Sequence, residues 1–180
     1  AVMRALNRAA AEAMLEVGVS ACTDVTGFGL LGHLREMAAA SGVDVEVEAA
    51  AVPLLSEARD LAAADCVPGG SLENLEHVSR HVDFAPGLSR VDRLLLADAQ
   101  TSGGLLITLP EERCDALLSV LHLRGVTDAR RIGRVAGREP GESRCVELPG
   151  FLRGRRRGTG HRPAVSVASV SSVPHPLHRP

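Results

Sequence analysis

Residues 21–34 of the 180-residue chain read ACTDVTGFGLLGHL, and this stretch decides how the rest of the sequence is interpreted. Residues 19–24 are short and half polar, as in a strand that ends in a polar loop, and a helix is predicted over 28–40. Between them, residues 27–32 (GFGLLG) fit the GxGxxG pattern of a dinucleotide-binding turn. That pattern is weak evidence here, because the first strand of such a fold is a buried, Val/Ile-rich run. The glycines can equally serve close packing of the turn against the helix.

Asp24 is the residue of chemical interest in this stretch. A carboxylate at a strand end, beside a glycine-rich turn, can hold a hard cation that bridges phosphate oxygens. The alternative is that Asp24 caps the helix or a turn through its side-chain oxygen, and local spacing alone favours that cap. His33, in the first turns of the helix, is expected to be a surface histidine or a core histidine with a hydrogen-bond partner.

Helical and strand periodicities extend outward from this stretch on both sides. Helices are predicted over 2–17, 54–64, 91–97 and from Pro110 to 123, and strands over 43–47, 105–109, 132–135 and 144–148. Residues 68–70 (PGG) indicate a break, and 71–90 have no clear pattern. The loop 98–104 (DAQTSGG) either presents backbone N–H groups to an anion or forms a tight turn, and both interpretations remain open.

Composition excludes several classes of protein. Hydrophobic residues make up 45% of the chain, which is enough for a core, yet no apolar run could span a bilayer. All 20 basic residues are arginine, so a Walker or Schiff-base lysine is absent from this sequence. Aromatic residues are 2%, which argues against a single-strand nucleic-acid platform. The four cysteines have no zinc-ligand spacing and are expected to be reduced thiols of a cytoplasmic protein.

The charge divides the chain at about residue 148. Residues 149–180 carry six arginines and no acidic residue, whereas residues 1–148 carry a net charge of −8. Arg, Gly, Pro, Ser and Val alternate in this last segment without a helical period or a reliable strand period. We therefore expect a domain over 1–148 and a disordered, dispensable basic tail over 149–180.

The quoted stretch closely resembles the motif that opens the C-terminal domain of selenophosphate synthetase (selenide, water dikinase). The order of further motifs agrees. Residues 67–71 (VPGGS) with Asn74 resemble the family's Pro-Gly-Gly-Thr segment and its asparagine, and residues 98–106 (DAQTSGGLL) resemble its Asp-Pro-Gln-Thr-Ser-Gly-Gly-Leu-Leu. Residues 132–135 (IGRV) match the Ile-Gly-x-Val near the family's end. The matches spread over residues 2–135.

The resemblance implies a fold, a reaction and a site. The fold class would be α+β, a three-layer α/β/α domain around a mixed β-sheet, like the C-terminal domain of aminoimidazole ribonucleotide synthetase. The complete family enzyme makes selenophosphate from selenide, ATP and water, releasing AMP and phosphate. By position, Asp24 would be a Mg²⁺ ligand, and Thr23 and Gly27 would lie on the cofactor-binding side of the same site. The resemblance also implies a homodimer when full length, with no membrane and no specific nucleic acid as partners.

The sequence departs from the family in several places. Ala99 stands where Pro is usual, Ser71 where Thr is usual, and residues 73–90 lack the usual Arg and Tyr. The family's N-terminal glycine-rich segment, its Cys or selenocysteine, its lysine and further metal-binding aspartates are not in this sequence. Two alternatives therefore stay open. The chain could belong to another ATP-dependent member of the superfamily, or it could be a catalytically inactive truncated subunit.

Overall fold

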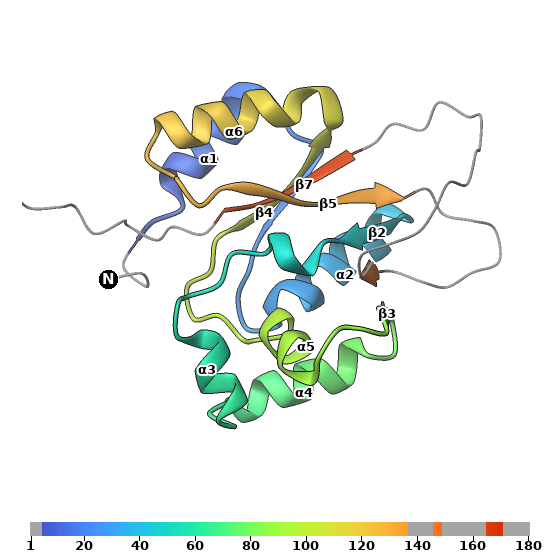
Figure 1. Ribbon diagram of the computed structural model, residues 1–180. Helices are drawn as coiled ribbons and strands as arrows, with labels where there is room; N and C mark the ends of the chain where they lie inside the picture. Colours follow the sequence, from blue (N-terminus) through green and yellow to red (C-terminus); the bar gives the residue numbers. More distant parts are fainter. Residues whose placement is uncertain (1–4, 137–145, 149–164, 171–180) are drawn as a thin grey trace, which may run out of the picture.

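The computed structural model describes residues 5–136, 146–148 and 165–170 of the chain. Figure 1 shows helices on both sides of a twisted sheet. The helices are α1 Arg8–Val17, α2 Gly29–Ser41, α3 Ala58–Ala63, α4 Gly69–Val78, α5 Arg90–Leu96 and α6 Cys114–Leu123, with short 3₁₀ turns at Ala49–Ala51 and Glu111–Arg113. The strands are β1 Ala21–Asp24, β2 Asp44–Val47, β3 Val82–Phe84, β4 Leu105–Pro110, β5 Arg130–Ala136, β6 Val146–Leu148 and β7 Val165–Val170.

The described strands form one mixed sheet in the order β1-β4-β7-β5-β2-β6-β3. The pairs from β1 to β2 are antiparallel, and β6 lies parallel to both β2 and β3. This order argues against the dinucleotide-binding interpretation of residues 27–32. The first strand of that fold lies inside a parallel sheet, whereas β1 lies at the edge of the sheet that the described residues form, and it pairs there with antiparallel β4.

Strand β4 divides the core in two because its successive side chains point to opposite faces. Leu106 belongs to one cluster, together with side chains of α2, β2 and β5. Ile107 and Leu109 belong to the other cluster, together with α1 and α6. In Figure 1, α1 and α6 lie over one side of the sheet, and α2, α4 and α5 lie over the other.

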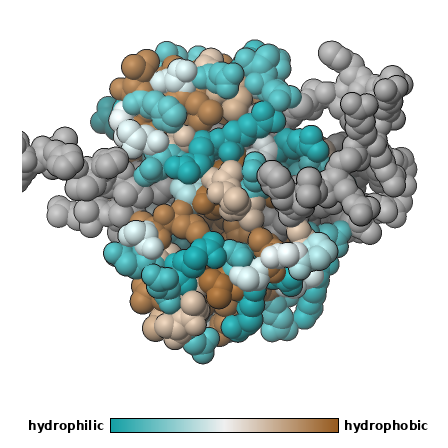
Figure 2. All heavy atoms as spheres, in the orientation of Figure 1, coloured by the Kyte–Doolittle hydropathy of each residue, from teal (hydrophilic) through white to brown (hydrophobic). Residues whose placement is uncertain are grey.

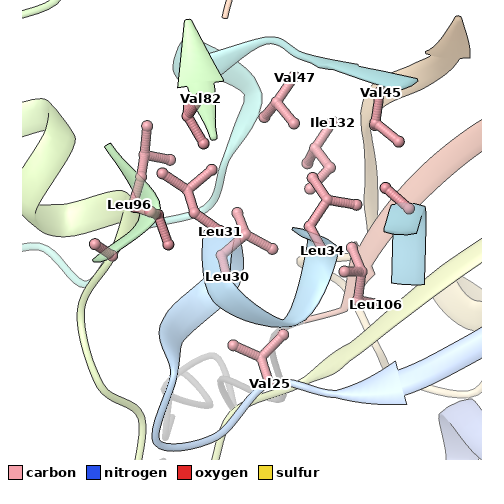
Figure 3. Close-up of a cluster of buried hydrophobic side chains, with 13 residues drawn as sticks. Val25, Leu30, Leu31, Leu34, Val45, Val47, Val82, Leu96, Leu106 and Ile132 are labelled. Atoms are coloured by element: carbon pink, nitrogen blue, oxygen red, sulfur yellow. The ribbon is translucent and has the colours of Figure 1, made fainter. Parts of the chain in front are cut away.

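Helix α2 fills the first cluster. Leu31 and Leu34 are fully buried, and Figure 3 shows them pointing toward the side chains of β2 and β5. The helix ends at Gly42, which has the left-handed conformation with φ of 63° that favours glycine at a helix C-terminus. On the face seen in Figure 2, hydrophobic and hydrophilic side chains are mixed over the helices. None of the described helices is long and apolar enough to cross a membrane.

Most predicted elements are confirmed, and several interpretations need correction. Gly69 and Gly70 do not lie in a break between secondary-structure elements. They begin α4, with Pro68 in an extended conformation at the N-cap. Helix α4 and strand β3 also occupy residues 71–90, which had no predicted structure. The helix predicted over 54–64 is confined to Ala58–Ala63.

The prediction of a disordered tail over 149–180 is wrong for residues 165–170. These residues form β7, which lies between β4 and β5 and pairs antiparallel with both. Val and Ser alternate from 165 to 167, which suits a strand. The deciding contacts are non-local, because the facing edges of β4 and β5 supply the hydrogen-bond partners of β7. The other residues of the tail lie outside the described part of the chain, and the domain boundary at 148 stays a prediction.

Candidate functional site

The segments singled out from the sequence meet at the loop that follows β1. Two backbone hydrogen bonds join this loop to the 98–104 loop: Val25 N donates to Gly104 O at 2.9 Å, and Gln100 N donates to Thr26 O at 3.0 Å. Gly103 is required for this approach, because a Cβ at that position would lie 2.1 Å from Val25 O. The 98–104 loop therefore packs against the loop after β1, as a tight structural turn does.

Asn74 of α4 connects the glycine-rich loop to the end of α5. Its side-chain nitrogen donates to Gly27 O at 2.8 Å and to Ala97 O at 3.1 Å. Gly29, at the start of α2, has φ of +67°, and a Cβ there would lie 2.6 Å from the backbone of Ala97. The glycine-rich turn is thus held on one side by a helix and on the other by the end of α5.

Buried Ser71 and half-buried Asp98 form a polar pair behind these contacts. The Ser71 hydroxyl donates to Asp98 Oδ1 at 2.5 Å and accepts a hydrogen bond from Ala99 N at 3.0 Å. Gln100 Nε2 donates to the other carboxylate oxygen, Asp98 Oδ2, at 3.1 Å. Ser71 is fully buried, whereas Asp98 and Gln100 are half-buried. The pair fixes the start of the 98–104 loop against α4.

Asp24 lies at the end of β1 with its side chain exposed. Helix α2 has Phe28 at its N-cap and no side-chain capping bond. Within the described part of the chain, the Asp24 carboxylate forms no hydrogen bond and no ion pair, while its backbone oxygen accepts from Thr23 Oγ1 at 3.2 Å. The capping alternative is therefore wrong for these residues, and the carboxylate oxygens remain open to solvent.

Thr23 and Gly27 flank Asp24 in the chain, and their assignment to the cofactor-binding side stays a prediction. Thr23 is half-buried on β1, and Gly27 is exposed in the loop. A Cβ built on Gly27 would meet nothing within 4 Å, so its backbone is open to the approach of another molecule. An exposed carboxylate and an accessible backbone turn therefore lie within four residues of each other.

The remaining polar groups near the loop have structural roles or are unreactive. His33 is buried, and its Nε2 lies 3.1 Å from Thr26 Oγ1, as expected for a core histidine with a partner. Burial raises the pKa of the Cys22 thiol, and the Asp24 carboxylate raises it further, so Cys22 is a poor nucleophile at neutral pH. Among the described residues, no group of three or more His, Cys, Asp or Glu side chains could hold a metal ion.

Two amide side chains that hold the loop region were not predicted from local sequence patterns. Asn74 was recognised only through the resemblance, and its contact with Gly27 spans 47 positions. Asn7 donates from Nδ2 to Gly103 O at 3.0 Å and had no signal at all in the sequence. Both are single amides that bind backbone carbonyls across the fold, and such contacts leave no periodic pattern in a sequence.

Comparisons with known proteins find relatives of the family that the sequence motifs resemble. Relatives named "Selenide, water dikinase" include one from Carboxydothermus hydrogenoformans, 44% identical over 136 residues that cover 76% of this chain and 39% of the relative. Another, from Geobacter metallireducens, is 49% identical over 125 residues that cover 69% of this chain and 36% of the relative. A third, from Myxococcus xanthus, is 44% identical over 142 residues that cover 78% of this chain and 40% of the relative.

The chain spans about two fifths of the length of these curated relatives. Residues 1–146 match the family described as "AIR synthase related protein, C-terminal domain". That match includes β1, the loop that carries Asp24 and Gly27, helix α4 and the 98–104 loop. The chain therefore belongs to the AIR synthase related protein family and corresponds to its C-terminal domain.

Proposed function

We propose that this chain is the C-terminal part of an ATP-dependent selenophosphate synthetase, which converts selenide, ATP and water into selenophosphate, AMP and phosphate. The observation that carries the proposal is the exposed Asp24 carboxylate, which has no partner among the described residues, beside the open backbone of Gly27. The loop that presents both is held by two of the segments through which the sequence resembles that enzyme family, the one that ends with Asn74 and the 98–106 segment.

The side chains present fit a Mg²⁺ ion bound jointly with phosphates. Mg²⁺ prefers oxygen ligands, keeps several waters and is usually held by one or two carboxylates plus substrate phosphates. Asp24 supplies one such carboxylate, and further ligands would come from ATP and from parts of the protein outside this sequence. When bound, the ion would offset the negative charge that develops on transferring phosphoryl groups.

The chain's own residues would bind and orient ATP. Gly27 leaves its backbone accessible on one wall of an ATP site, with Thr23 on the neighbouring strand. Asn74 fixes the Gly27 carbonyl, and Gln100 fixes the carbonyl of Thr26, so the loop is positioned before a ligand arrives. Such pre-positioning lowers the entropic cost of binding.

The same proposal covers the finer features that the resemblance implies. The two cores on opposite faces of β4 support a three-layer α/β/α arrangement. The complete protein would act in the cytoplasm as a homodimer, with selenide and ATP as its substrates and no specific nucleic acid as a partner. The isolated chain, which contains no lysine, is expected to be inactive.

The test joins this chain to the N-terminal part of the Carboxydothermus hydrogenoformans relative and measures AMP release from ATP and selenide. Asp24→Asn should lower that release at least about tenfold, because the charge that holds the ion is gone. Asp115→Asn, which alters another exposed carboxylate, should leave it unchanged. Both substitutions should leave the thermal midpoint of the 180-residue chain unchanged.

Three results would contradict the proposal. Full activity of the Asp24→Asn chimera would remove Asp24 from the site. Steady AMP release by the isolated chain would mean that a catalytic set lies within these 180 residues. A folded parent chimera that releases no AMP would favour the inactive-subunit alternative.

A further inference from the structure

A hollow of about 350 Å³ lies between α2 and α4, beside the glycine-rich loop. It is lined on the α2 side by Phe28, Arg35 and Glu36, and on the α4 side by Glu73, Asn74 and His77. A volume of this size is within the range of small-molecule sites. None of the roles proposed above uses its charged side chains.

Arg35 is the first sign of a ligand. Its Nε is buried and has no hydrogen-bond partner in the described part of the chain. A guanidinium has five N–H donors and no acceptor, so a buried, unpaired Nε requires an acceptor from elsewhere. A carboxylate is the acceptor whose geometry matches two adjacent guanidinium donors.

The other charges in the hollow restrict what the ligand can be. Glu36 and Glu73 are exposed on either side of Arg35's surroundings, so the formal charge of the lining is −1 with His77 neutral. A simple anion would satisfy Arg35 but would be repelled by two carboxylates. A simple cation would pair with the carboxylates but would leave the Arg35 Nε unsatisfied. A ligand that carries both charges meets both demands.

The hollow also offers an apolar surface. The Phe28 side chain is 57% exposed, and Val78 lies buried at the α4 wall. Gly32 allows Phe28 its position, because a Cβ on Gly32 would lie 2.7 Å from Phe28 Cβ. An aliphatic group could therefore cover the Phe28 ring and remove apolar surface from water.

We infer that this hollow binds a free α-amino acid with an aliphatic side chain. Its carboxylate pairs with Arg35, its ammonium group faces Glu36 and Glu73, and its side chain lies against Phe28. The inference does not rest on the proposed catalytic function. Asn74 lines the hollow and also holds the Gly27 carbonyl, so an occupied hollow adjoins the candidate phosphate loop.

His81 provides a spectroscopic probe of the Arg35 contact. Burial lowers the pKa of His81, and the positive charges of Arg35, His77 and Arg80 lower it further. A carboxylate bound to Arg35 would offset part of that positive charge and would raise the His81 pKa. A ligand without a carboxylate would not.

The test titrates the 180-residue chain with L-leucine, leucinamide and N-acetyl-leucine by calorimetry, and follows His81 by NMR. L-leucine should bind, and each analogue, which lacks one of the two charges, should bind at least about tenfold more weakly. Arg35→Gln should weaken leucine binding by a similar factor. Arg80→Gln, an arginine of the same region that does not line the hollow, should change it less than about twofold.

Glu73→Gln keeps the inference testable if Arg35→Gln does not fold, since Glu73 is exposed and its loss should also weaken leucine binding. The inference is overturned if none of the three compounds binds. It is also overturned if leucinamide or N-acetyl-leucine binds as tightly as leucine, or if leucine binds without raising the His81 pKa.

Discussion

Ser71→Ala removes the hydroxyl that joins α4 to the 98–104 loop. In the native chain this hydroxyl donates to Asp98 Oδ1 at 2.5 Å and accepts from Ala99 N at 3.0 Å. Its side chain is fully buried, and its two partners, Asp98 and Ala99, are half-buried. The substitution therefore tests whether this pair holds the loop that contacts Thr26 and Gly29.

The cost follows from the two bonds. A hydrogen bond to a charged group contributes about 1.5–3 kcal/mol, and a neutral one about 1 kcal/mol. We expect Ser71→Ala to lower the free energy of unfolding by about 3 kcal/mol. For a chain of this size, each kcal/mol shifts the thermal midpoint by about 2–4 °C, which predicts a fall of about 6–12 °C.

Ser79→Ala is the matched control. Ser79 follows the last residue of α4, is exposed, and its hydroxyl only donates back to Leu75 O at 2.6 Å. An exposed substitution of this kind changes stability by less than about 0.5 kcal/mol. Thermal unfolding followed by circular dichroism, with guanidinium unfolding at 25 °C, measures both variants. If Ser71→Ala melts within about 1 °C of the parent chain, the polar pair does not hold the loop and the reasoning fails.

Three further predictions test the glycine turn, the inserted strand and the thiols. Gly29→Ala should destabilise the chain by more than about 2 kcal/mol, because Gly29 has φ of +67° and a Cβ there would clash with backbone atoms. The control Gly70→Ala, in α4 with open space around it, should stabilise the chain slightly. Equal thermal midpoints of the two variants would contradict the expected clash. Val167→Pro should lower the midpoint by several degrees, since proline removes a donor from a strand paired on both sides; an unchanged midpoint would show that β7 contributes nothing. Iodoacetamide at pH 8 should modify Cys66, which is exposed, well before Cys22, whose pKa burial raises; peptide mapping that finds the reverse order would exclude this environment for Cys22.

Local patterns in the sequence predicted the parts of the fold that local forces decide. The apolar spacing of residues 28–40 predicted α2 to within about a residue at each end, and the run at 105–109 predicted β4. The alternation of Val and acidic residues at 43–47 predicted β2 and its buried face. The position of Asp24 at a strand end beside a glycine turn was also evident, because strand and turn preferences act over a few residues.

The tertiary structure alone decided what these elements touch. The sequence could not show that β1 lies at the edge of the sheet that the described residues form, that residues 165–170 enter the sheet between β4 and β5, or that Asn74 binds the Gly27 carbonyl. Nor could it exclude the cap at Asp24, which local spacing favoured, whereas the structure shows the carboxylate without a partner among the described residues. A hydrophobic period fixes which face of an element is buried, whereas its neighbours are chosen by hydrogen bonds and packing between segments far apart in the chain.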